Sequence, residues 1–303
     1  MKPFYLILLL VMNFFWAGVY SAYKVLDQHG LSPAGIVTLR FGLAGLCLAL
    51  VWRWLPGAAP RGRHLVITGL MGLMLYVVGQ RLQVLGNHLG TAGNSSVLMA
   101  VEPLLTSVAA AVFLREPIGP RRLGGFILGL VGVALLNGVW RPDFRWTGLA
   151  ASLIFISSFI CEAGYSVLGK PIVQRASVMK MLAISLWVGT LGNLLIDGPQ
   201  TAVAAGRLPP SAWALLAGLA ILCTAVGYGV WFVVIRECPV NLAALTVFSQ
   251  AIFGVPIAAL WLGEQIHWGH FLGSLTIVTG LALGFSRQIK PNPKAQNPTP
   301  AAD

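Results

Sequence analysis

The stretch FLREPIGPRRLGGFILGLVGVAL, Phe113 to Leu135, has a counterpart 148 residues later in WLGEQIHWGHFLGSLTIVTGLAL, Trp261 to Leu283. A shared Leu-x-Glu-x-Ile motif is followed by the same glycine spacing, and the identical positions include Leu114/Leu262, Glu116/Glu264, Ile118/Ile266, Gly125/Gly273 and Gly132/Gly280. An apolar sequence gives some chance matches, but hardly a motif and a spacing together. The chain therefore contains an internal repeat.

The composition indicates an all-α integral membrane protein. Of 303 residues, 57% are hydrophobic and 10% are charged, with a mean hydropathy of +0.80, whereas soluble domains carry about 25% charged residues. Transmembrane β-strands are shorter and alternate apolar with polar residues. A bilayer span needs about 20 apolar residues, and we expect ten transmembrane helices at 4–23, 33–54, 64–87, 91–114, 123–140, 147–167, 178–196, 212–235, 240–261 and 269–286.

The repeat divides these ten spans into two halves of five. We place the first half at 1–141 and the second at 142–286, with a Pro-rich, polar and disordered cytoplasmic tail at 287–303. Because five is odd, the second half enters the membrane from the opposite face. Two inverted five-helix repeats are typical of secondary transporters, whose substrate site lies near the midplane between the repeats.

The basic charge of the chain follows its topology. The net charge is +11, which taken alone suggests a nucleic-acid partner. With the N-terminus inside, however, 14 of the 20 Lys and Arg residues fall on the inner side and 4 on the outer side. This is the positive-inside pattern. We expect a bacterial inner-membrane protein with both termini cytoplasmic, a lipid-bilayer environment and no nucleic-acid partner.

Motifs for enzymatic chemistry are missing from the sequence. GxxxxGK[ST], HExxH, GxSxG and CxxC do not occur, and Asp27, Asp143, Asp197 and Asp303 are assigned to loops and the tail. We expect no enzyme activity, no cofactor and no metal site. A channel usually shows a ring of repeated ligands, and none is obvious, so a carrier of a small-molecule solute is favoured.

Polar and aromatic residues at helical spacing mark a candidate substrate path, because polar side chains in membrane helices tend to face the bundle interior. Under the 148-residue offset, Tyr76, Gln80 and Gln83 fall on Thr224, Tyr228 and Trp231. Plain packing remains open for Tyr228 and Trp231, as does interhelical bonding for Asn13. The expected substrate-binding residues are Asn13, Trp16, Tyr20, Tyr76, Gln80, Gln83, Ser95, Met99, Glu102, Thr224, Tyr228, Trp231, Thr246, Ser249 and Gln250.

Glu102 and Pro103 interrupt the apolar fourth span near the membrane centre. Three interpretations of Glu102 stay open: structural bonding or pairing with Arg40 or Arg81, contact with a solute amino group, and proton coupling. Pro103 and Pro256 each remove a helical hydrogen bond, and we expect both to act as hinges.

Other charged residues and small residues receive structural interpretations. Arg40 is read as structural, with a substrate carboxylate as the alternative, and Arg81 and Glu162 are left open. Two glutamates are expected to pair with nearby cations: Glu116 with Arg121 and Arg122, and Glu264 with His267. The small-residue pairs Gly125/Gly129 and Gly280/Gly284 favour packing within the bundle over a dimer interface, so we expect a monomer or weak dimer.

The chain resembles the EamA-type transporters of the drug/metabolite transporter superfamily. Three features carry the resemblance: the two five-helix halves, the sequence VEPLLTSVAAAVFLREPI in the fourth span, and the sequence ALWLGEQI in the ninth span. Within that family the chain also resembles the YddG-type amino-acid exporters, because of its mid-span aromatic residues. One departure is that Gln250 and Ala251 replace the second Glu-Pro. The resemblance implies an alternating-access exporter of small metabolites, foremost amino acids including aromatic or apolar ones. The alternative is a multidrug, sugar-phosphate or nucleotide-sugar carrier, of which the last two should show clustered Lys or Arg at the midplane.

Overall fold

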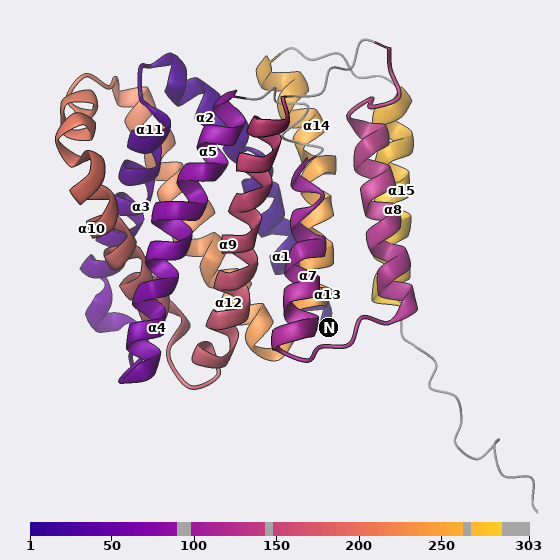
Figure 1. Cartoon of the computed structure of the whole chain (residues 1–303), viewed down its shortest axis with the longest axis horizontal. Coiled ribbons are helices and arrows are strands. Elements are labelled where there is room, and N and C mark those ends of the chain that lie inside the picture. Colours follow the sequence, from indigo (N-terminus) through magenta and orange to yellow (C-terminus); the bar gives the residue numbers. More distant parts are fainter. Residues whose placement is uncertain (90–97, 143–147, 263–267, 287–303) are drawn as a thin grey trace, which may run out of the picture.

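The computed structural model describes residues 1–89, 98–142, 148–262 and 268–286, and within these ranges it contains helices and loops but no strand (Figure 1). The elements are α1 Pro3–Ala17, α2 Val19–Gln28, α3 Pro33–Leu50, η1 Trp52–Trp54, α4 Arg63–Gly72, η2 Leu73–Gly79, α5 Gln80–Leu89, α7 Glu102–Phe113, α8 Pro120–Leu136, α9 Leu149–Val173, α10 Val178–Ala205, α11 Pro210–Gly218, η3 Leu219–Val226, α12 Gly227–Glu237, α13 Val240–Leu245, η4 Thr246–Phe248, α14 Ser249–Leu262 and α15 Trp268–Phe285.

Several of these helices join end to end into longer apolar stretches. Eight stretches within the described residues are long and apolar enough to cross a membrane: Pro3–Gln28, Pro33–Leu50, Arg63–Leu89, Leu149–Val173, Val178–Ala205, Pro210–Glu237, Val240–Ile257 and Trp268–Phe285. The all-helical membrane class is thus confirmed. In the remaining predicted spans, 91–114 and 123–140, lie α7 and α8, so the count of ten stays a prediction.

Large apolar side chains lie on the surface of the bundle, and several polar side chains are buried inside it. Leu195 on α10 is 88% exposed and Phe271 on α15 is 73% exposed, whereas Asn13, Thr68 and Asn193 are fully buried. This arrangement fits a chain whose outer face meets lipid and whose inner face holds polar groups that the hydrocarbon would not solvate.

The packing of the helices is symmetric between the two halves: the main contacts between a helix of the first half and a helix of the second half have an equivalent with the halves interchanged. One edge of the bundle is formed by α3 and α10, which correspond to the second and seventh predicted spans (Figure 1). The opposite edge is formed by α8 and α15, which correspond to the fifth and tenth. Likewise α1 packs on α14, and α7 packs on α9. This pairing fits the predicted repeat.

Glycines allow α8 and α15 to approach closely, in agreement with the packing within the bundle that the sequence predicts. A Cβ on Gly125 would lie 2.8 Å from the Gly280 carbonyl oxygen, and one on Gly280 would lie 2.9 Å from that of Gly125. Gly132 and Gly273 have the same relationship, at 2.8 and 2.6 Å. Since Gly125 corresponds to Gly273 and Gly132 to Gly280, the two contacts are exchanged by the repeat.

Gly132→Ala tests this glycine contact. The added methyl group has backbone on its far side and cannot be accommodated by a rotamer change, so we expect a loss of about 1–3 kcal/mol, the usual range for overpacking. Thermal unfolding in detergent measures it. Gly218→Ala is the matched control, because nothing lies within 4 Å of the position that its methyl group would take. Equal melting temperatures for the two variants would contradict the tight packing of α8 on α15.

A polar cluster closes the end of the bundle at which the chain begins. Lys170 at the end of α9 donates to Glu116 Oε1 at 2.7 Å and to the Cys238 carbonyl at 2.7 Å. The Asn241 amide donates to Glu116 Oε2 at 3.2 Å, and Arg122 donates to the Asn241 side-chain oxygen at 2.6 Å. The sequence predicts Arg121 or Arg122 as the partner of Glu116. Its ion-pair partner is instead Lys170 from the second half, because the loop after α7 folds across α9 and α13.

Disrupting this ion pair should destabilise the protein. The Lys170 and Glu116 side chains are 13% and 12% exposed, so Lys170→Met leaves a nearly buried carboxylate without its cation, at a cost of about 3–5 kcal/mol. Glu116→Gln with Lys170→Met removes both charges and should cost less than the single Lys170 change. Melting temperature and maleimide labelling of Cys238 measure the effect. If Lys170→Met changes neither, the cluster does not close this end.

Candidate functional site

A cavity lies between the two halves, and the side chains that line it come from both. The first half supplies Trp16, Val19, Tyr20, Arg40, Gln80, Gln83, Met99 and Glu102, and the second half supplies Glu162, Ser166, Tyr228, Trp231 and Gln250. Three pairs in this wall are related by the 148-residue repeat: Gln80/Tyr228, Gln83/Trp231 and Glu102/Gln250. The cavity therefore occupies the place where the helices of the two repeats face one another.

Arg40, on α3, is buried in this wall at 3% exposure. Its Nε donates to Thr224 Oγ1 at 2.9 Å, and one terminal nitrogen donates to the Tyr23 hydroxyl. The guanidinium lies over the rings of Tyr23 and Phe41, 5.7 and 5.0 Å from their centroids. The second terminal nitrogen has no hydrogen-bond partner among the described residues. Arg40 thus has the structural bonds expected of it, and it lines the cavity with one terminal nitrogen still unused.

Glu162, on α9, is held by neutral donors. Gln80 Nε2 donates to Glu162 Oε1 at 2.6 Å. The Tyr228 hydroxyl lies 3.3 and 3.4 Å from the two carboxyl oxygens. These contacts orient the carboxyl group without neutralising a charge, and they place it beside the aromatic part of the wall.

That aromatic part is formed by Trp16, Tyr228 and Trp231. The ring of Trp16 lies 5.5 Å from that of Tyr228 and 6.4 Å from that of Trp231, centroid to centroid. Trp231 Nε1 donates to Ser166 Oγ at 3.1 Å, and Trp16 Nε1 donates to the Cys223 carbonyl at 2.7 Å. With their polar atoms satisfied, the indoles present apolar ring surface to the cavity.

Glu102 opens α7 and contributes its carboxyl group to the cavity wall. No described residue donates a hydrogen bond to it, and Arg81, one of its two expected partners, is bound elsewhere. Pro103 occupies the first turn of α7, and a turn at Ala100–Val101 separates it from the helical residues Leu98 and Met99. The helix therefore breaks at the proline, where the missing amide hydrogen leaves a carbonyl without its helical partner.

Five expected site residues lie behind the wall and do not line the cavity. Asn13 donates to the Thr246 carbonyl and hydroxyl at 3.0 and 3.1 Å and accepts from Gln250 at 3.0 Å. Tyr76 bonds to Tyr165 at 2.8 Å. Their second-layer position arises because the short amide and hydroxyl groups find partners on neighbouring helices. The five are Asn13, Tyr76, Thr224, Thr246 and Ser249, all buried; Ser95 lies outside the described residues.

Two π-helical segments occupy corresponding places in the halves. They are η2, between α4 and α5, and η3, between α11 and α12. Each π-helix leaves carbonyls without their usual partner, and side chains of other helices supply donors: Asn193 Nδ2 binds the Tyr76 carbonyl at 3.0 Å, and Trp16 binds that of Cys223. Such segments are frequent at functional sites. Here the first ends directly before Gln80, and the second ends two residues before Tyr228.

The position of Asp197 corrects an expectation from the sequence, and its contact with Arg81 gives that arginine, which the sequence left open, a partner. Hydropathy alone assigns Asp197 to a loop, but α10 continues to Ala205 and holds Asp197 inside the bundle. Arg81 donates to Asp197 Oδ1 at 2.9 Å and to Asn193 Oδ1 at 2.7 Å, and Thr38 also donates to Asp197 at 2.9 Å. Arg81 is thereby used in holding α5 against α10, which leaves Arg40 as the arginine of the cavity.

Sequence reasoning leaves four lining residues out of the expected site: Val19, Arg40, Glu162 and Ser166. A signal for two of them is present, since Ser158, Glu162 and Ser166 follow one another at intervals of four residues and therefore share one face of α9. Within the described residues, no group of three or more His, Cys, Asp or Glu side chains is arranged to hold a metal ion.

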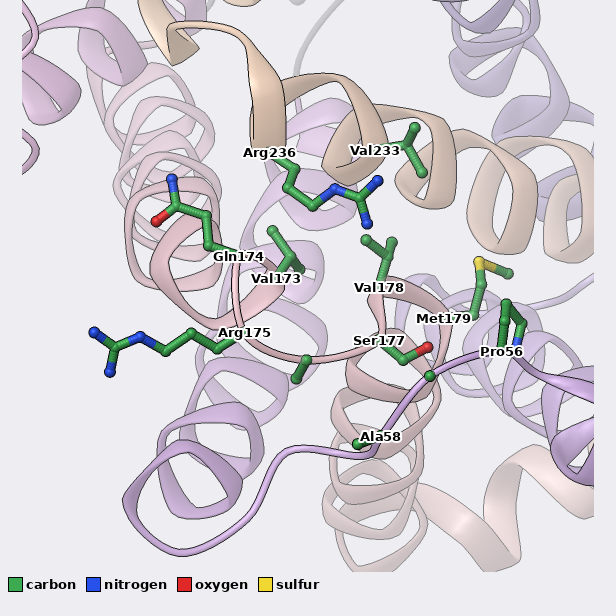
Figure 2. A pocket seen from close by; sticks show the side chains of 12 residues that line it. Pro56, Ala58, Val173, Gln174, Arg175, Ser177, Val178, Met179, Val233 and Arg236 are labelled. Carbon is green, nitrogen blue, oxygen red and sulfur yellow. The ribbon is translucent and has the colours of Figure 1, made fainter.

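A second hollow lies where the loops before α4 and α10 meet the end of α12 (Figure 2). In Figure 2 Arg236 reaches across this hollow toward Val178, whereas Arg175 points away from it. Its lining residues come from 56–58, 173–179, Val233 and Arg236, and none of them lines the central cavity. The hollow is therefore a separate feature of the surface.

Comparison with known proteins adds to this geometry. The sequence profile described as "EamA-like transporter family" matches residues 3–138 and again residues 149–286. The chain belongs to the EamA-like transporter family. Its place in that family, expected from the Glu-Pro motif and the repeat, is confirmed, and the family supplies the class of membrane transporter.

The individual relatives have low sequence identity to this chain, but the alignments cover most of its length. A "Probable terminal-alkyne amino-acid exporter" of Streptantibioticus cattleyicolor is 26% identical over 250 residues, which cover 82% of each chain. A "Probable amino-acid metabolite efflux pump" of Escherichia coli is 23% identical over 200 residues, covering 63% of this chain and 66% of the relative. A solved crystal structure superposes with a TM-score of 0.73 at 15% identity, covering 94% of this chain and 97% of the other, and supports the fold.

Proposed function

We propose that this EamA-family transporter exports amino acids, including those with aromatic or apolar side chains, by alternating access between two inverted five-helix repeats. The observation that carries the proposal is one cavity, between the halves, that combines ring surfaces with carboxylates and the Arg40 guanidinium. Rings of Trp16, Tyr228 and Trp231 suit an apolar side chain, and the charged groups suit an amino acid's backbone. The names of the two exporter relatives agree with this class.

The setting proposed for this activity follows from the charge distribution. Both termini face the cytoplasm, and the chain spans the bacterial inner membrane ten times. The 14-to-4 excess of Lys and Arg on the inner side supports this orientation. The described glycines of α8 and α15 are used within one chain, which favours a monomer or a weak dimer.

The charges of the cavity argue against anionic solutes. Arg40 is the one cation among the described lining residues, and two carboxylates accompany it. A sugar phosphate or nucleotide sugar carries at least one phosphate, and the cavity offers it one guanidinium beside two carboxyl groups rather than a cluster of cations. A multidrug carrier remains the second candidate, because the aromatic wall would also accept apolar drugs.

Transport by purified protein in proteoliposomes tests the proposal. We expect saturable, counterflow-stimulated flux of radiolabelled phenylalanine, tryptophan or leucine, and none of glucose 6-phosphate. Empty liposomes and liposomes with the Lys170→Met variant serve as controls for leak and for loss of fold. If an apolar drug cation is carried and no amino acid in a complete panel is, the amino-acid proposal is wrong and the multidrug candidate replaces it.

Glu102→Gln tests the acid that has no donor among the described residues. Glutamine keeps the shape and removes the charge. If Glu102 shares the solute ammonium with the other carboxyl group of the wall, Glu162, the affinity for amino acids should be about 10- to 100-fold weaker, the worth of one charged hydrogen bond. The melting temperature should not fall. Gln250→Glu, at the equivalent position of the other half, is an informative partner variant, because it adds a carboxylate across the cavity. Unchanged affinity in Glu102→Gln would assign Glu102 to structure.

A further inference from the structure

Opposite charges face the cavity without pairing with one another. Arg40 lies on α3, Glu102 on α7 and Glu162 on α9, and all three belong to one wall. Within the described part of the chain no ion pair joins Arg40 to either carboxylate, although Arg40 and Glu162 are otherwise held in place. Elsewhere in the bundle such charges do pair, as Arg81 does with Asp197 and Lys170 with Glu116. The cavity is thus the part of the described interior where opposite charges remain separated.

The groups that hold Arg40 and Glu162 are neutral. Arg40 donates to the hydroxyls of Tyr23 and Thr224, and Glu162 accepts from Gln80 and Tyr228. These bonds fix the two side chains and reduce the cost of burying them. None of these partners carries a charge, so neither side chain has an ion-pair partner among the described residues. A molecule with both a carboxylate and an ammonium group would supply both compensations at once.

We propose that Arg40 and Glu162 determine specificity by binding opposite poles of one zwitterionic solute. Arg40 receives the carboxylate through its unused terminal nitrogen, and Glu162 receives the ammonium group. This assignment rests on the proposed function, that the cavity carries amino acids, and it adds two residues that the repeat pattern did not single out. Gln80, Tyr228 and Thr224 then act as positioning residues, since they hold the charged groups and do not touch the solute's poles.

Glu102 makes the two poles unequal. With two carboxyl groups and one guanidinium in the described wall, the cavity can compensate a second positive group more readily than a second negative one. The expected order of affinity is therefore zwitterion first, then an amine without a carboxylate, and last an acid without an amine. This order is specific to the charge arrangement, because the aromatic surface contributes equally to solutes with the same ring.

Three probes with one phenyl ring separate the poles: phenylalanine, phenethylamine and 3-phenylpropionate. Their affinities are measured by tryptophan fluorescence and calorimetry on the full-length protein in detergent. Wild-type protein should bind phenylalanine about 10- to 100-fold more tightly than phenethylamine, because one charged contact is lost, and phenylpropionate least of all. Glu162→Gln should weaken phenylalanine and phenethylamine and leave phenylpropionate unchanged or tighter. Arg40→Lys, which keeps the charge but not the planar donor, should weaken phenylalanine and leave phenethylamine unchanged.

Controls separate this pattern from a general loss of structure. Glu237→Gln removes an exposed carboxylate at the end of α12 and should leave all three affinities as in wild type. Melting temperatures identify a misfolded variant, and Glu162→Asp, which keeps the charge, should recover part of the affinity that Glu162→Gln loses. The assignment is wrong if a variant binds all three probes equally more weakly, or if Glu162→Gln and Arg40→Lys both keep the wild-type order of affinities. In either case, binding of phenylalanine by the wild-type protein would still support the proposed function. Wild-type protein that binds no amino acid overturns both.

Discussion

Polar side chains of the first half find their partners in the second half, and the assembly of the bundle depends on this. Thr38 and Arg81 reach Asp197, Gln80 reaches Glu162, and Glu116 reaches Lys170. In an apolar surrounding, a polar group without a partner costs several kcal/mol. Neither half alone supplies hydrogen-bond partners for these groups. Packing of the two halves against each other therefore removes the free-energy cost of placing unpaired polar groups in the bilayer.

The contacts between the halves differ in kind along the bundle. At the edge formed by α8 and α15, glycines bring backbone against backbone, which a small shift would disrupt. At the end where the chain begins, an ion pair and hydrogen bonds join the halves, and water can replace such bonds. In the proposed alternating access, the glycine edge is suited to stay together while the polar cluster opens.

Periodicity and the repeat predict the helices and most of the cavity, but they do not predict the pairing of charges. Nine of the fifteen expected residues line the cavity because hydrophobic patterning locates helix faces, and helix faces locate the interior. The predictions for Asp197 and Glu116 are wrong for a common reason: their partners, Arg81 and Lys170, lie far away in sequence. Spacing along a helix reports neighbours within about one turn, whereas these pairs are created by packing between the halves.

The three charged residues of the cavity all depart from the repeat. Arg40 corresponds to Val188, Glu162 to Phe14 and Glu102 to Gln250, each an uncharged residue. The glycines and the π-helical segments, which shape the backbone, do follow the repeat. A charge inside a membrane protein is expensive, and the fold forms without one at the equivalent positions. The backbone symmetry therefore serves the architecture, while the asymmetric charges give the cavity a direction in which a polar solute can be oriented.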